Sequence, residues 1–88
     1  MHIAEGFIAR KVGADTVVIA VGERAKIFQG MVKLNETAAD IWHWIGEGLS
    51  EEQIAERLVQ EYEVDSETAA KDTRDILDEM EKQGFLER

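Results

Sequence analysis

Hydrophobic residues change their spacing along the chain at Asn35. Before this position they occur in clusters rich in β-branched side chains, and after it they recur at three- and four-residue intervals. A spacing near two is typical of strands, whereas a spacing near 3.6 is typical of helices. The pattern therefore predicts strands in the first part of the chain and helices in the second.

Three extended segments are predicted before the change in spacing. The segment Phe7–Val12 alternates loosely, and Gly13-Ala14-Asp15 follows it as a turn-like cluster. The next segment, Thr16–Val21, is strongly β-branched, so we expect these two segments to form an antiparallel hairpin. A third segment is expected over Lys26–Leu34, where Gly30 predicts a bulge and Met31–Leu34 should be the regular part.

The first predicted helix begins after Asn35, whose side-chain oxygen can cap the first turn, and runs to about Glu47. Its inward face is expected to contain Ala38, Ile41, Trp42 and Ile45, followed by Leu49. His43 and Trp44 lie outside this face. Because an exposed tryptophan often marks a protein contact, Trp44 is a candidate for docking a partner enzyme or a second copy of the chain. The alternative is partial burial of Trp44 against the sheet or Phe85.

Two further helices carry their own start signals. Ser50 and Gln53 have the spacing of a capping box, which predicts a helix from Ser50 to about residue 63. A third helix is expected from Asp65 or Ser66 to about Gln83, with Gly84 as its stop. The predicted inward residues are Ile54, Ala55, Leu58 and Tyr62 in the second helix and Ala69, Thr73, Ile76, Leu77 and Met80 in the third.

These elements predict an α+β fold of the winged-helix type, in which a three-stranded antiparallel sheet is followed by a three-helix bundle. Eighty-eight residues are enough for one modest core, so we expect a single domain over residues 1–88. Phe85 and Leu86 follow the last helix and are expected to fold back under that core.

The composition excludes several classes of protein. The chain has no cysteine, so it contains no disulfide, thiolate-bound zinc, iron–sulfur cluster or thiol nucleophile. Its longest apolar run, Val17–Val21, is far too short to span a bilayer, and residues 1–5 do not have the form of a signal peptide. We therefore expect a cytoplasmic protein that does not contact a membrane.

The net charge of −9 is unevenly distributed. Residues 1–34 contain five basic and three acidic side chains, whereas residues 35–88 contain five basic and sixteen acidic ones. The third predicted helix, which would be the recognition helix of a DNA-binding winged helix, has six acidic and three basic side chains. Such a helix is repelled by phosphates, which argues against nucleic-acid binding. The acidic part is either a solvated face or attracts a basic partner.

Catalytic and metal-binding patterns are not found. The two histidines are His2, near a terminus that we expect to be frayed, and His43, and they do not form a ligand pair on one face. The hydroxyls of Thr37, Ser50 and Ser66 lie at cap positions, where a structural role is the simpler interpretation. The sequence therefore predicts a binding protein without enzymatic activity, metal or cofactor.

A set of motifs extends over most of the chain from about Phe7 onward. They are Val21-Gly22-Glu23, the run Phe28–Trp42, the segment Gly48–Ile54, Leu58, Tyr62–Asp65, Asp72 and Gly84–Leu86. Together they resemble the motifs of the PqqD family. The block Leu34–Trp42 is the most specific of them. The resemblance implies a peptide chaperone, or RiPP recognition element, that binds the leader segment of a ribosomally made precursor peptide. Such a domain presents the peptide to a modifying enzyme, often a radical S-adenosylmethionine (radical SAM) protein.

The resemblance also implies where the peptide binds. In this family it adds as a strand to the exposed edge of the third strand and packs against the third helix. The matching residues here are Met31, Val32, Lys33, Asp72, Thr73, Ile76 and Met80. Core packing is the alternative role for each of them, and helical spacing leaves open which flank of the helix faces the strand. Lys33 and the bulge at Gly30 are expected to protect this edge from self-pairing.

Two other functions remain possible on the sequence alone. One is a winged-helix transcriptional regulator that binds DNA, and the other is an accessory subunit that dimerises or docks without binding peptide. A homodimer is compatible with each of the three functions.

Overall fold

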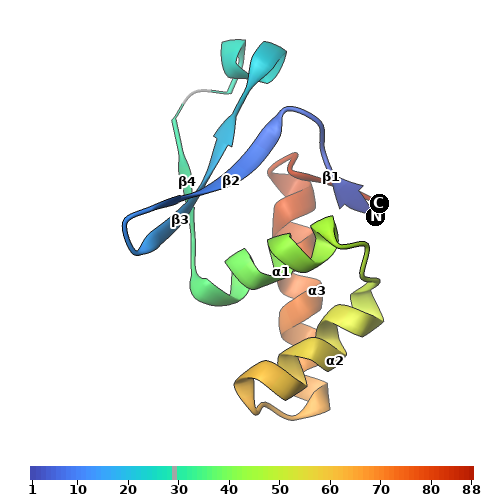
Figure 1. Ribbon diagram of the computed structural model, residues 1–88. Coiled ribbons are helices and arrows are strands. Elements are labelled where there is room, and N and C mark those ends of the chain that lie inside the picture. The colour runs from blue at the N-terminus through green and yellow to red at the C-terminus, as the bar shows by residue number, and fades with distance from the viewer. Residues whose placement is uncertain (29) are drawn as a thin grey trace.

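The computed structural model describes residues 1–28 and 30–88. A three-stranded antiparallel sheet is followed by three helices, and a short two-stranded sheet joins the two ends of the chain (Figure 1). The predicted α+β fold is therefore confirmed, and the two-stranded sheet is an element that the sequence pattern did not reveal.

The three-stranded sheet has the order β2-β3-β4, so β4 lies at one edge. Strands β2 (Phe7–Val12) and β3 (Asp15–Ala20) form the predicted hairpin, with Phe7 opposite Ala20 and Val12 opposite Asp15. The turn between them needs a residue with positive φ, which Gly13 supplies at +64°. The third strand, β4 (Val32–Leu34), pairs antiparallel with β3.

The register of the sheet separates a core face from an outer face. Side chains at alternate positions belong to the core or pack against it, namely Phe7, Ala9, Val18, Ala20, Val32 and Leu34. On the outer face, Ile8 is 41% exposed and Val12 is 53% exposed. Lys33 is the direct partner of Val17 and therefore also belongs to the outer face.

The prediction of a third strand over Lys26–Leu34 is wrong before Val32, because none of the described residues 26–28, 30 and 31 is in a strand, and this includes Met31 of the expected regular part. Residues Gly22–Lys26 form a 3-10 helix, η1, in place of a simple turn. The amides of Ile27 and Phe28 both donate to the carbonyl of Arg24, which continues the tight winding. Because the chain is wound tightly as far as Phe28, β4 begins only at Val32 and has three residues. Gln29, which the prediction included, lies outside the described residues.

The three predicted helices are present as α1 (Glu36–Gly46), α2 (Glu51–Tyr62) and α3 (Ser66–Lys82). Each has a side-chain cap at its start, because the first amides of a helix have no partner within the helix.

The caps at Asn35 and Ser50 are those that the sequence predicts, whereas Thr37 and Ser66, also expected at cap positions, lie inside α1 and α3. Asn35 accepts a hydrogen bond from the amide of Ala38 at 2.8 Å. Ser50 and Gln53 form both hydrogen bonds of the capping box, at 3.2 and 2.9 Å. The side chain of Asp65 caps α3.

The two ends of the chain pair with each other. Strand β1 (His2–Ile3) runs antiparallel to β5 (Leu86–Glu87), and Figure 1 shows the termini next to each other. The imidazole of His2 lies 3.0 Å from the carboxylate of Glu87. The expectation that the N-terminus is frayed is therefore wrong. Phe85 and Leu86 are buried, which confirms that they fold back under the core.

Aromatic rings connect the sheet, the first helix and the C-terminal segment. Phe7, Phe28 and Trp42 each contact the ring of Phe85 edge to face, with centroids 5.0 to 5.8 Å apart. Ile41 and Trp42 are buried, as predicted. Within the described part of the chain, none of the helices is long and apolar enough to cross a membrane.

Candidate functional site

The free edge of β4 is the first candidate site. This strand pairs with β3 on one side, and in the described residues no strand pairs with its other side. Val32 and Leu34 are partly buried and pack against the core, whereas Lys33 is exposed. An edge strand of this kind offers backbone amides and carbonyls to an added strand.

Lys33 contacts the outer face of the sheet. Its ammonium lies 3.4 Å from the carboxylate of Asp15 on the neighbouring strand. Lys33 and Arg10 are the direct cross-strand partners of Val17, which is only 8% exposed although it points away from the core. Lys33 therefore helps to cover the outer face beside the edge.

Two large apolar side chains just before β4 point into solvent. Ile27 is 78% exposed and Met31 is 67% exposed. Between them in the sequence, Phe28 turns inward and packs edge to face on Phe7, with ring centroids 5.2 Å apart. We refer to Ile27 and Met31 together as the apolar flank of β4.

Thr73 and Met80 do not line an open groove, so this part of the prediction is wrong. Thr73 is fully buried and Met80 is 4% exposed. Together with Ala69 and Leu77 they form the apolar stripe by which α3 packs into the core. The Thr73 hydroxyl is buried and has no hydrogen-bond partner in the structure.

The remaining two residues of the predicted helix site stay accessible. Asp72 is exposed and Ile76 is partly buried against the core. The other flank of α3 is marked by Arg88, which contacts Asp78 at 2.8 Å and Glu51, the first residue of α2, at 3.7 Å. Asp78 therefore faces α2 and the C-terminus.

Helical spacing places a second group of residues on the opposite side of the apolar stripe. These residues are Asp72, Ile76 and Glu79. We refer to them as the open flank of α3, because they lie across the stripe from Asp78, which faces α2.

Trp44 is buried, so the prediction of an exposed docking residue is wrong. Its side chain is 6% exposed and belongs to the core cluster. The guanidinium of Arg57, from α2, lies over the indole ring at 5.5 Å from its centroid. The helical wheel showed that Trp44 lies off one apolar face of α1. It could not show that α2 covers the side of α1 that carries Trp44.

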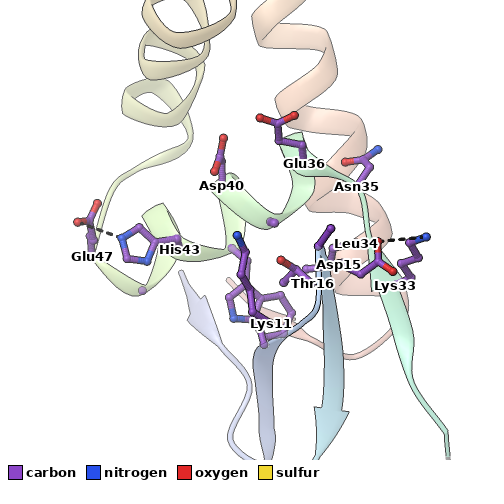
Figure 2. A pocket seen from close by; sticks show the side chains of 15 residues that line it. Lys11, Asp15, Thr16, Lys33, Leu34, Asn35, Glu36, Asp40, His43 and Glu47 are labelled. Atoms are coloured by element: carbon purple, nitrogen blue, oxygen red, sulfur yellow. Dashed lines mark ion pairs between the residues drawn. The ribbon is translucent and has the colours of Figure 1, made fainter.

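A second candidate site is a hollow between α1 and the tip of the β2–β3 hairpin, with a volume of about 990 Å³ (Figure 2). Its lining includes the small residues Ala9, Ala39 and Gly46, and also Trp42. Charged side chains surround it, including Lys11, Asp15, Lys33, Glu36, Asp40, His43 and Glu47. We call it the α1 hollow. The sequence analysis did not identify it, because it exists only where two segments distant in sequence meet.

Asp40, on the rim of the α1 hollow, is held by Tyr62 from α2. The phenol hydroxyl donates a hydrogen bond to the Asp40 carboxylate. Burial, and then this hydrogen bond, raise the pKa of Tyr62 to about 12. In the described part of the chain, no three His, Cys, Asp or Glu side chains are grouped so that they could hold a metal ion.

The three-stranded sheet, with β2 and β4 at its edges and three capped helices after it, is a winged-helix-like α+β domain. Residues 15–86 match the family described as Coenzyme PQQ synthesis protein D (PqqD), and the chain belongs to this family. No curated protein matches the sequence.

Two solved structures have the same fold. A structure described as TbiB1 in complex with the TbiA(beta) leader peptide has a TM-score of 0.83 and 24% identity, and covers 99% of this chain and 95% of that chain. A lasso peptide synthetase B1 complexed with the leader peptide has a TM-score of 0.80 and 23% identity, and covers 96% and 93% of the two chains.

Proposed function

We propose that this protein binds the leader segment of a ribosomally synthesised precursor peptide and presents it to a modifying enzyme. The observation that carries the proposal is the open edge of β4 in a fold of the PqqD family. Both structural neighbours are described as complexes with a leader peptide, which supports the same assignment.

Strand addition to β4 explains how such a peptide is held. The free amides and carbonyls of β4 bind the backbone of the peptide, and neighbouring side chains select its sequence. Met31 and Val32 of the predicted site lie at this edge, and Ile76 lies on the open flank of α3. The role is binding and presentation in the cytoplasm, without catalysis. A radical SAM enzyme as the partner, and a homodimer, remain predictions.

Binding to DNA is not favoured. The helix α3 has six acidic and three basic side chains. The acids Asp72, Asp75, Asp78 and Glu79 are all exposed. A helix with this charge is repelled from the phosphates that supply most of the affinity for DNA.

The direct test is an NMR titration of the ¹⁵N-labelled protein with synthetic leader peptides. The peptides are taken from short precursor genes that neighbour the gene for this chain. We expect the amides of residues 31–34 and those of Asp72 and Ile76 to shift together. Shifts confined to Lys11, His43 and Glu47 would place the peptide in the α1 hollow and contradict strand addition to β4.

Peptide N-methylation isolates the backbone contribution without changing the protein. An added strand alternates its amides between the edge of the sheet and solvent. We therefore expect methylation to abolish binding at every second position of the peptide and to be tolerated in between. Equal tolerance along the peptide would contradict strand addition.

A matched pair of variants tests the apolar flank. Met31→Ser removes an exposed apolar side chain next to β4, whereas Val12→Ser removes one from β2, which lies at the opposite edge of the sheet. We expect only Met31→Ser to weaken peptide binding. Equal effects would show that general surface hydrophobicity, and not the β4 edge, holds the peptide.

A further inference from the structure

The surface next to β4 has large exposed apolar side chains, which free strand edges usually avoid. Ile27 and Met31 have the largest exposed fractions among the large apolar side chains of the described residues. Natural proteins protect free edges with charges, prolines or covering elements. Apolar side chains at this place indicate a surface that is covered when the protein works.

The open flank of α3 carries two exposed carboxylates. Asp72 and Glu79 lie on either side of Ile76 along the helix. In the described residues neither carboxylate forms an ion pair, whereas Asp75 pairs with Lys71 at 2.8 Å. Glu79 accepts a hydrogen bond from the amide of Gln83, which leaves its charge uncompensated.

The basic side chains nearest to β4 in the sequence do not neutralise these carboxylates. Lys33 pairs with Asp15 at 3.4 Å on the outer face of the sheet. Lys26 pairs with Glu23 at 3.2 Å within η1. The open flank therefore has two carboxylates that form no ion pair in the described residues.

We infer that the β4 edge selects a leader segment that combines a bulky apolar side chain with lysine or arginine. The apolar side chain covers Ile27 and Met31, and the basic side chains face Asp72 and Glu79. This inference rests on the proposed function, since it names the chemical class of the peptide that the same site takes. Opposite charges also speed the encounter and exclude acidic peptides.

The test is selection from a phage-displayed library of random twelve-residue peptides on the immobilised full chain. We expect the selected peptides to be enriched in lysine or arginine together with large aliphatic or aromatic residues. A selected peptide is then synthesised and its Kd is measured at low and high salt. Asp72→Asn/Glu79→Gln should weaken its binding about fivefold to tenfold at low salt, and less at high salt.

Glu56→Gln/Glu61→Gln is the matched control, because it removes two exposed charges from α2. It should leave the Kd within about twofold. Selected peptides without basic residues would overturn the inference and leave the proposed function intact. An equal effect of both double variants would overturn it too, because it would show a response to net charge alone. If no peptide from the library or from the precursor genes binds, the proposed function itself fails.

Discussion

Two apolar stretches of this chain have opposite environments. In the stretch Ile41–Ile45 of α1, four of the five side chains are buried, and the exposed one is His43. In the stretch before β4, Ile27 and Met31 are exposed by 78% and 67%. The residue types are similarly hydrophobic, so composition does not explain the difference.

The difference lies in what covers each stretch. On one side of α1, Trp42 packs against Phe85, and on another side Trp44 lies under Arg57 of α2. The stretch before β4 leads to an open edge of the sheet, and among its described residues Phe28 turns inward whereas Ile27 and Met31 do not. Ile27 and Met31 are left uncovered by the fold next to a free strand edge. Exposed apolar side chains at such a place indicate a surface to which a partner binds.

Removing Trp44 is expected to have the largest effect on stability. Trp44→Ala should lower the free energy of unfolding by about 3–5 kcal/mol, because it empties a buried volume. The control is His43→Ala, whose side chain is 73% exposed, and it should change stability by no more than about 0.5 kcal/mol. Urea unfolding measures both. Equal stability of the two variants would contradict the burial of Trp44. The contrast between the two stretches would then not hold.

Gly6 lies against Arg24 of η1, the element that precedes the apolar flank in the sequence. Its φ is +95°, and a Cβ placed there would lie 2.2 Å from Cγ of Arg24. Gly6→Ala should therefore cost about 2–4 kcal/mol, from backbone strain and steric overlap together.

Gly22→Ala is the control for Gly6→Ala. Gly22 also has a positive φ, +61°, but has open space around the added methyl group, so its substitution should cost only about 1–2 kcal/mol. Equal costs would show that Arg24 moves aside freely and that η1 is not held by this contact.

The hydrogen bond between Tyr62 and Asp40 links α2 to α1 and helps to keep the first stretch covered. Tyr62→Phe should lower stability by about 1 kcal/mol at pH 7. An unfolded tyrosine loses its proton near pH 10, whereas the pKa of Tyr62 in the folded protein is about 12. Between these values the unfolded state binds fewer protons, so the advantage of tyrosine over phenylalanine should decrease as the pH rises. An advantage that is constant from pH 8 to 12 would contradict this linkage.

A substitution of Thr73 tests whether the apolar stripe of α3 is fully buried in the core and makes no contact with the peptide. Its hydroxyl is buried without a hydrogen-bond partner. Thr73→Val keeps the shape of the side chain and should raise the free energy of unfolding by up to about 1 kcal/mol, with peptide affinity unchanged. Thr68→Val, at an exposed position of the same helix, should give no gain. A loss of stability or of affinity in Thr73→Val would show that the hydroxyl has a partner after all.

The smallest effect on stability is expected from substitutions in the stretch before β4. Ile27→Ser/Met31→Ser should change the free energy of unfolding by no more than about 0.5 kcal/mol, because these side chains have few contacts to lose. Thermal unfolding of the free protein gives this value. A loss of several kcal/mol would show that the flank is part of the core, and the comparison with α1 would fail.

Local signals predicted most of the secondary structure. The caps at Asn35, Ser50 and Asp65 each depend on groups within three residues of one another, and so does the glycine turn of the hairpin. The start of the third strand was wrong because η1 is fixed by tertiary contacts, such as the position of Arg24 over Phe7. The pairing of β1 with β5 joins opposite ends of the chain, which no local pattern specifies.

The candidate site was predicted less well, for a related reason. Helical spacing correctly placed Thr73 and Met80 on the apolar stripe of α3, but it could not show that the stripe is fully covered. Asp72 and Ile76 remain accessible because they lie at its margin. Trp44 shows the converse error, since α2 covers a side of α1 that the wheel left open. Periodicity gives the direction of a side chain, and only the packing of whole elements determines its exposure.

The pairing of β1 with β5 has a consequence for the order in which the protein can fold during synthesis. The amide of Ala4 donates to the carbonyl of Phe85 at 2.7 Å, and the ring of Phe85 touches Phe7, Phe28 and Trp42. The N-terminal strand leaves the ribosome first but has no partner until the residues after α3 follow. The hairpin and the first two helices can form on the nascent chain, whereas the centre of the core closes only after release of its last aromatic ring.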